Sequence, residues 1–246
     1  MNTKNCPKLI TMRHEEKFLC SERQMVLLES RIKTLLSPDA NQTGEGYNIR
    51  SVYFDTIGDR LLEESAQGVD DRNKFRIRIY NGTDNMIRLE KKSSVGQLKQ
   101  KHSCKLDRAY VDKILQGNAW PTEILEKNPV LQEFEYLQMD QRLAPSVIVE
   151  YDRSAYVSLL GNIRITFDKN IRASKQTQHF FGDSLLTLPI LPDGQHVLEV
   201  KYDSIFPGYL SRALNLSNLQ RVSFSKYGLC RNIIDHNGRI EDYYEF

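Results

Sequence analysis

Apolar and polar side chains alternate with a period of two along much of this chain, which predicts strands with one apolar and one polar face. The clearest run is KFRIRIY at 74–80, where aromatic and aliphatic residues alternate with cations. Turn sequences at Asn81-Gly82 and Gly161-Asn162 favour antiparallel connections between neighbouring strands. We expect strands at 8–19, 47–55, 74–80, 86–92, 98–105, 147–158, 163–168 and 195–203.

Helical patterns flank these strands. Residues 21–24, with the sequence SERQ, have the residue types of a capping box at the start of a helix. Another helix opens at Asn128-Pro129, because proline suits the first turn. We expect one α+β domain over residues 1–246, with a helical insertion at about 107–142, since all-β barrels often reach this length as one domain. The expected helices are 21–36, 61–66, 107–116, 130–142, 207–216 and 225–234.

Composition excludes several kinds of protein. No apolar stretch approaches the roughly eighteen residues of a membrane span, and the start of the chain lacks the apolar core of a signal peptide. We therefore expect no membrane segment and a cytoplasmic location. The cysteines stand far apart without a C-x-x-C pair, so neither a zinc site nor a disulfide framework is expected. Neither an H-E-x-x-H motif nor a G-x-x-x-x-G-K loop occurs.

Charge is concentrated on the polar faces of the predicted strands. These could be the solvated outer faces of an antiparallel sheet. Solvated faces normally mix neutral polar residues with charges, however, whereas these faces are rich in Arg and Lys. Eleven cations and four carboxylates give them a net charge of +7, against +2 for the whole chain. The residues are Arg13, Glu15, Lys17, Lys74, Arg76, Arg78, Arg88, Glu90, Lys92, Lys101, Arg153, Arg164, Asp168, Glu199 and Lys201.

This concentration of charge indicates a tunnel. If the sheet closes with the charged faces inward, it forms an antiparallel β-barrel with flanking helices, and eight or so strands leave room for a small ligand. Cations at such density repel one another unless an anion lies between them. Arginine forks match phosphate oxygens in pairs. The few inward carboxylates would then suit a divalent metal, Mg²⁺ or Mn²⁺.

Motifs along nearly the whole chain resemble the VTC-domain polyphosphate polymerases of the triphosphate tunnel metalloenzyme (CYTH-like) superfamily. Each motif is weak alone, but the ordered set is specific. The wider superfamily opens with E-x-E-x-K, so Arg13 stands where its first glutamate would be, which favours a long phosphate chain over one metal-bound triphosphate. The matching segments are R-x-E-x-K at 13–17, KFRIR at 74–78, LEKK at 89–92, the lysine at 101, VEYDRSAY at 149–156, NIRITFD at 162–168, VLEVKYD at 197–203 and SKY at 225–227.

The resemblance implies a triphosphate tunnel that takes ATP and inorganic polyphosphate or triphosphate. It implies that Glu199 holds Mn²⁺ or Mg²⁺, with Glu15 and Glu90 as further candidate ligands. The catalytic residues it implies are Lys17, Arg76, Arg78, Lys92 and Glu199, and the phosphate- or nucleotide-binding residues are Arg13, Lys101, Tyr151, Arg153, Arg164, Lys201, Ser225 and Lys226.

The activity implied is an ATP:polyphosphate phosphotransferase of the polyphosphate kinase type. Two alternatives stay open. In a metal-dependent triphosphatase, water replaces the phosphate acceptor and Glu15 or Glu90 orients it. A non-catalytic polyphosphate-binding protein would not need Glu199. A nucleic-acid partner is not expected, because aromatic residues are not interleaved with the basic positions. The sequence leaves oligomeric state, preferred metal, nucleotide selectivity, direction of chain growth and the role of the Tyr-rich end at 243–246 open.

Overall fold

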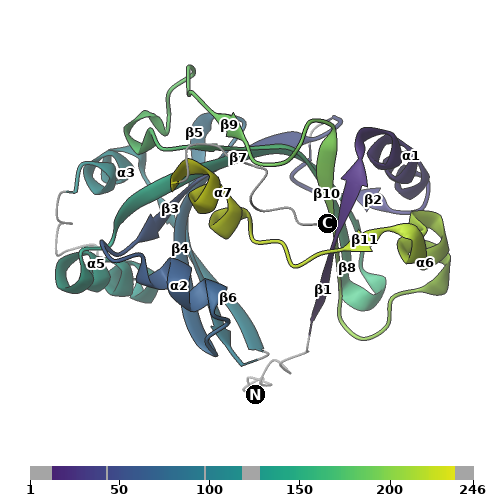
Figure 1. Ribbon diagram of the computed structural model, residues 1–246, viewed down its shortest axis with the longest axis horizontal. Coiled ribbons are helices and arrows are strands. Elements are labelled where there is room, and N and C mark those ends of the chain that lie inside the picture. Colours follow the sequence, from purple (N-terminus) through teal and green to yellow (C-terminus); the bar gives the residue numbers. More distant parts are fainter. Residues whose placement is uncertain (1–12, 43, 97, 118–127, 236–246) are drawn as a thin grey trace, which may run out of the picture.

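The computed structural model describes residues 13–42, 44–96, 98–117 and 128–235, so residues 8–12 of the first predicted strand and the segment 243–246 lie outside it. One antiparallel sheet in the order β11-β1-β10-β8-β7-β3-β4-β5-β6 dominates the fold (Figure 1). The α+β class expected from the sequence is confirmed. The long strands are β1 (His14–Ser21), β3 (Tyr47–Asp55), β4 (Asp71–Tyr80), β5 (Thr83–Val95), β6 (Leu98–Leu106), β7 (Ala144–Ser158), β8 (Ile163–Ser174) and β10 (Gln195–Tyr202).

Strand β8 is longer than the sequence pattern indicated, because it continues to Ser174 instead of ending at Asp168. Asn170 has a left-handed φ of 52°, and the pairing with β7 shifts register near it. This irregularity breaks the alternation, and beyond it Ile171 and Ala173 lie on the concave side, in the core cluster that includes Tyr227 and Cys230. Three two-residue strands, β2 (Ser37–Pro38), β9 (Leu188–Pro189) and β11 (Gln220–Arg221), are too short to give a periodic signal.

The sheet curves into a tunnel, but hydrogen bonds do not close it. Within the described ranges, no strand pairing joins β6 to β1, so the expected barrel is not closed by hydrogen bonds and is open along this seam. One reason is that β1 gives its second edge to β11, with Phe18 opposite Arg221 and Leu19 opposite Gln220. Across the open seam, Lys99 of β6 lies 3.8 Å from a carboxylate oxygen of Glu15 on β1.

Helices α1 (Glu22–Lys33), α3 (Arg108–Leu115), α5 (Pro129–Gln141) and α6 (Gly208–Leu214) cover the outer side of the sheet (Figure 1). The capping box is confirmed: Ser21 Oγ accepts from Gln24 N, and Gln24 Oε1 accepts from Ser21 N at 2.8 Å. The helix it begins packs Met25 and Ile32 against the apolar face of β1, β8 and β10. The described residues also form α2 (Arg60–Ala66) and α7 (Lys226–Asp235).

On the other flank, α3 and α5 cover the outer face of β4 and β5. Phe134 of α5 packs edge-on against Phe54 and lies beside Phe75, and Ile77 and Leu89 are fully buried in the same cluster. Because the apolar face of each strand is turned to these helices, the alternate charged face must point into the concave side of the sheet. This orientation shows that the charged faces line the concave side of the sheet and are not its outer surface.

No helix in the described ranges has the length and apolarity needed to cross a bilayer.

Helix α7 differs from the others because it lies inside the curve of the sheet (Figure 1). Its residues Tyr227, Cys230 and Ile233 join a core cluster with inward residues of β3, β7 and β8. Asp55, at the end of β3, anchors it: the carboxylate accepts from the Tyr227 hydroxyl and from the Leu61 and Leu62 amides at 2.9 and 3.0 Å. Asp55 thus connects the start of α2 to α7.

We expect Asp55→Ala to lower the free energy of unfolding by about 3 kcal/mol, because it leaves several buried donors without an acceptor. Asp84→Ala is the matched control, since among the described residues Asp84 forms an exposed ion pair with Arg108 at 3.6 Å, and the change should cost less than about 1 kcal/mol. Urea unfolding of both variants measures this. Equal small losses would show that Asp55 does not anchor α7.

Candidate functional site

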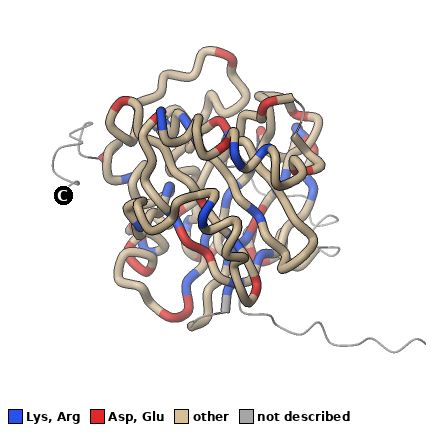
Figure 2. The backbone as a smooth tube through the Cα atoms, turned by 90° about the vertical axis from the view of Figure 1, so that its right-hand side faces the viewer, with Lys and Arg blue, Asp and Glu red and all other residues tan. Residues whose placement is uncertain are grey.

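The concave side of the sheet encloses a cavity of about 1290 Å³. Figure 2 shows Lys and Arg positions recurring along the backbone through the middle of the molecule, with Asp and Glu positions between them. Every candidate site residue taken from the sequence lines this one cavity. They are Arg13, Glu15, Lys17, Arg76, Arg78, Glu90, Lys92, Lys101, Tyr151, Arg153, Arg164, Glu199, Lys201, Ser225 and Lys226.

One wall of the cavity is the ladder formed by β4 and β5. Arg76 lies opposite Glu90, donating from Nε to Oε2 at 2.7 Å, and its Nη1 donates to the Tyr53 hydroxyl at 2.8 Å. Lys101 of β6 contacts the other oxygen of Glu90. Burial alone would raise the pKa of Glu90, but the charges of Arg76, Arg78 and Lys101 hold that pKa well below its usual range. Glu90 is therefore an ionised partner for these cations, and its geometry argues against a role as a metal ligand.

The opposite wall, formed by β1 and β10, carries two adjacent carboxylates. Register places Lys17 opposite Glu199 and Glu15 opposite Lys201. Lys201 Nζ lies 2.5 Å from Glu199 Oε1 and 3.9 Å from Glu15 Oε2, while Lys17 Nζ lies 3.1 Å from Glu15 Oε1. Burial opposes ionisation of Glu199, but Lys201 and Lys226 hold its pKa well below the usual range. Both glutamates are therefore anionic at neutral pH.

The start of α7 brings a further cation into the cavity. Lys226 Nζ lies 2.6 Å from Asp168, and the same carboxylate receives two donors from Arg153, at 2.6 and 2.7 Å. Asp168 is fully buried, so it holds these two cations in place instead of facing a ligand. The Tyr151 ring lies beneath both, with centroid distances of 5.1 Å to Arg153 and 5.0 Å to Lys226.

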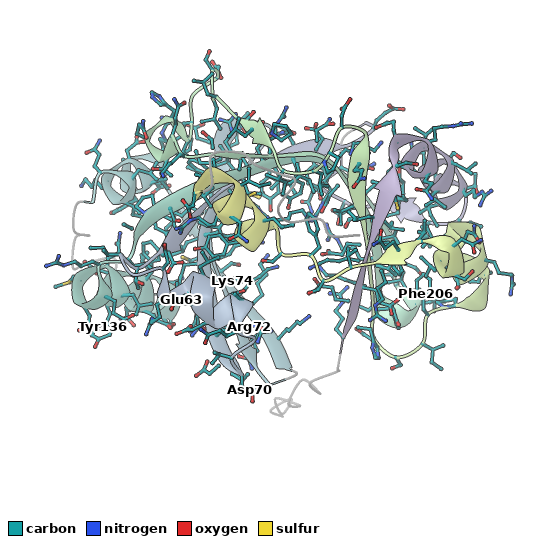
Figure 3. All side chains as sticks on the ribbon, viewed as in Figure 1. Glu63, Asp70, Arg72, Lys74, Tyr136 and Phe206 are labelled. Carbon is teal, nitrogen blue, oxygen red and sulfur yellow. The ribbon has the colours of Figure 1, made fainter. Side chains whose placement is uncertain are left out.

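Lys74 and Lys92 face each other across the β4–β5 ladder, and among the described residues no carboxylate lies within ion-pair distance of either (Figure 3 labels Lys74). Lys74 donates weakly to Ser225 Oγ at 3.4 Å. Burial, with the neighbouring charges of Arg72 and Lys17, lowers the pKa of Lys74 to about 8. The charge of Arg76 lowers the pKa of Lys92 well below its ordinary value. These lysines are poised for an anion.

The sequence criterion of alternating charge missed the contribution of β3. Its inward residues include Tyr47 and Tyr53, while Arg50 points outward and pairs with Glu150 at 2.5 Å. Tyr47 accepts from Arg164 through its hydroxyl at 3.3 Å, as Tyr53 does from Arg76. The tyrosines therefore orient the arginines. Tyr47 and Tyr53 are an even number of residues apart in the predicted strand 47–55, so they share a face. A search for alternating charge alone does not detect this pattern.

A divalent metal fits this site only together with a ligand. Within the described ranges, no three His, Cys, Asp or Glu side chains form a metal cluster. Glu15 and Glu199 are close enough to interact electrostatically, and Lys201 lies between them. Mg²⁺ is typically bound by one or two carboxylates, with phosphate oxygens and water completing its octahedron. The two glutamates match that donor set.

A family model described as the VTC domain matches residues 12–234, which is most of the chain. The chain belongs to the VTC domain family. None of the curated proteins matches this VTC domain in sequence.

Solved structures resemble this VTC domain at low identity. A Bacillus halodurans protein named provisionally as an adenylate cyclase has a TM-score of 0.51 and 13% identity, covering 96% of this chain and 98% of that chain. A conserved hypothetical protein from Pyrococcus furiosus has a TM-score of 0.40, 10% identity and coverage of 83% and 87%. The Mimivirus capping enzyme triphosphatase has a TM-score of 0.36, 10% identity and coverage of 82% and 88%. The first likeness shows a shared fold.

We expect the affinity for tripolyphosphate to fall about threefold to tenfold between about pH 7 and about pH 9. The pKa of Lys74 is about 8 in the free protein, and a polyanion binds the protonated form of Lys74 better. Binding is therefore coupled to proton uptake, and the affinity falls as the pH rises and Lys74 loses its proton. Calorimetry in buffers of different ionisation enthalpy measures both the affinity and the proton uptake.

Lys74→Arg is the control, because arginine keeps its charge across this window and so reports only the titration of the ligand and the other groups. An identical pH profile in the wild type and in Lys74→Arg would contradict a role for Lys74 in proton uptake.

Proposed function

We propose that this VTC domain is an ATP-dependent polyphosphate polymerase, which transfers the γ-phosphate of ATP to a growing inorganic polyphosphate chain. The observation that carries the proposal is the row of inward cations, in which Lys74 and Lys92 lack a carboxylate partner among the described residues. The cavity of about 1290 Å³ also exceeds the roughly 300–1,000 Å³ that accommodates a drug-sized ligand, which suits a long anion.

The proposed binding residues surround the phosphates from several strands. Arg76 and Arg78 present their guanidinium groups from β4, where Tyr53, Ser51 and Tyr151 hold them. Arginine forks placed in this way can each contact two phosphate oxygens. The remaining proposed phosphate ligands are Arg13, Lys17, Lys92, Lys101, Arg153, Arg164, Lys201, Ser225 and Lys226.

Glu199, with Glu15, is the proposed ligand for Mn²⁺ or Mg²⁺. When bound, such a metal neutralises charge on the transferred phosphoryl group. The two glutamates would orient it from β1 and β10, facing the cationic wall of β4 and β5. Lys201 and Lys17 contact these carboxylates in the free protein, so each would turn to phosphate oxygens as the glutamates take the metal.

The transfer needs alignment and charge neutralisation more than a protein nucleophile. A terminal oxygen of the polyphosphate forms a bond to the γ-phosphorus, the bond from that phosphorus to the β,γ-bridging oxygen breaks, and ADP leaves with the electron pair. The acceptor oxygen is already ionised, so no base is required. Arg76, Arg78 and Lys92 would hold donor and acceptor in line and stabilise the charge that shifts to the ADP oxygen.

A metal-dependent triphosphatase is the second candidate, since water could enter the same cavity. Glu90 is fully buried, and cations contact both of its carboxylate oxygens. Glu15, whose side chain is 19% exposed, is therefore the better candidate to orient water.

Incubation with ATP and Mn²⁺, with and without a short polyphosphate primer, should yield ADP and lengthened polymer. The products distinguish the candidates: orthophosphate as the sole phosphate product would indicate the triphosphatase, and the absence of turnover with retained polyphosphate binding would indicate a binding protein. Resolving the polymer on a gel and measuring ADP by chromatography provide the two readouts.

We expect Glu199→Gln to reduce turnover by a factor of about 100 or more, while polyphosphate still binds, because the variant loses a charged metal ligand and keeps the cations. Glu45→Gln is the control, since the Glu45 side chain is 97% exposed. Retained activity in Glu199→Gln would remove this residue from the metal site. Calorimetry with polyphosphate in the absence of metal confirms that the cavity is intact.

A further inference from the structure

Aromatic side chains line the cavity, contrary to the expectation that rings would be absent among the basic positions, and most of them already pack on protein groups. Tyr53 and Tyr227 stack on each other, with centroids 4.9 Å apart at 19°. Tyr151 lies under two cations, as described above. Phe224 lies 5.7 Å from the ammonium of Lys226 and is only 5% exposed. These rings support the cationic wall and do not offer a free face.

Tyr80, at the inner end of β4, differs from these rings. It is partly exposed, lines the cavity and packs at the edge of the core cluster that contains Tyr47, whose ring it meets tilted, at a centroid distance of 6.0 Å and 55°. Met86, across the β4–β5 turn, also lines the cavity and is 41% exposed. Exposed apolar surface that faces a wet cavity is costly unless something covers it. Asn81 and Asn85, at the same turn, also line the cavity.

The two ends of the cavity thus differ in chemistry. At the β4–β5 turn, the lining is Tyr80, Met86 and two asparagines. At the other end of the same strands, it is Arg72, Ser94 and Lys99, which can bind phosphate but present no ring (Figure 3 labels Arg72). A nucleoside triphosphate has the same asymmetry, since a flat base with hydrogen-bonding edges is attached to a polyanion.

Resting on the proposed polymerase function, we propose that Tyr80 and Met86 form a subsite for the base of the nucleoside triphosphate donor. The base stacks on the exposed part of the Tyr80 ring, and amide side chains at the same turn reach its edge. Inward positions along a strand are about 7 Å apart, so Arg78 and Arg76 lie successively deeper, where the phosphates of a base-anchored nucleotide would extend. The end with Arg72 and Lys99 is then left for the polyphosphate chain.

Binding of ATP and of tripolyphosphate, measured by calorimetry without divalent metal so that neither turns over, tests this subsite. The two ligands share the triphosphate and differ in the nucleoside. We expect Tyr80→Leu to weaken ATP binding about fivefold or more, the loss of one base stack, while tripolyphosphate binding stays within about twofold. Tyr80→Phe should retain ATP affinity, because it keeps the ring.

Tyr136→Leu is the surface control, since Tyr136 is 61% exposed on α5, at the outer edge of the molecule and away from the cavity (Figure 3). Met86→Ser gives the same comparison at an exposed position if Tyr80→Leu does not fold. An equal loss for both ligands, or no loss for ATP, overturns the nucleoside subsite. If the wild-type protein binds tripolyphosphate but does not make polymer from ATP, the proposed polymerase function is overturned instead. The comparison of ATP and tripolyphosphate binding still tests the nucleoside subsite in that case.

Discussion

Positive charge turned away from bulk water is the constraint on which this structure depends. Two like charges about 4 Å apart repel by about 4 kcal/mol at an effective dielectric constant of 20, so a wall of arginines and lysines cannot form without compensation. Buried carboxylates provide it. Glu90 serves Arg76 and Lys101, and Asp168 serves Arg153 and Lys226. Both carboxylates are fully buried, and Glu90 also pairs with Arg78 at 4.0 Å, so each fixes the direction in which its cations point.

This arrangement explains why α7 lies inside the sheet. Lys226 is the first residue of that helix, and it reaches Asp168 only if the helix packs on the concave side. The hydrogen bond from Tyr227 to Asp55 and the apolar residues Cys230 and Ile233 hold it there. The helix therefore closes part of the core and delivers a cation at the same time. Stability and site geometry rest on the same contacts, so a change that loosens α7 should affect both.

The sequence was most informative where the period of two is unbroken. On β4, the alternation of Lys74 and Arg76 with Phe75 and Ile77 specified both the strand and its inward face, because the opposite face had helices to pack against. It was least informative where the deciding contact is long-range. The pairing of Lys226 with Asp168, the use of β1 by β11 at the seam, and the turning of Glu90 toward cations all depend on tertiary structure. The second half of β8 was missed for a local reason: Asn170 adopts a left-handed conformation, which interrupts the strand pattern.

The division between paired and unpaired cations bears on how a polymer could be bound and yet move. Cations that share a buried carboxylate keep their position but exert a reduced net field on a ligand, because the carboxylate opposes them. Lys74 and Lys92 have no such partner among the described residues, and their lowered pKa values show that they hold their protons weakly without an anion. A polyanion would therefore be attracted most strongly at one place and guided by weaker contacts elsewhere. Under the proposed polymerase function, this uneven distribution would let a growing chain shift along the cavity without leaving it.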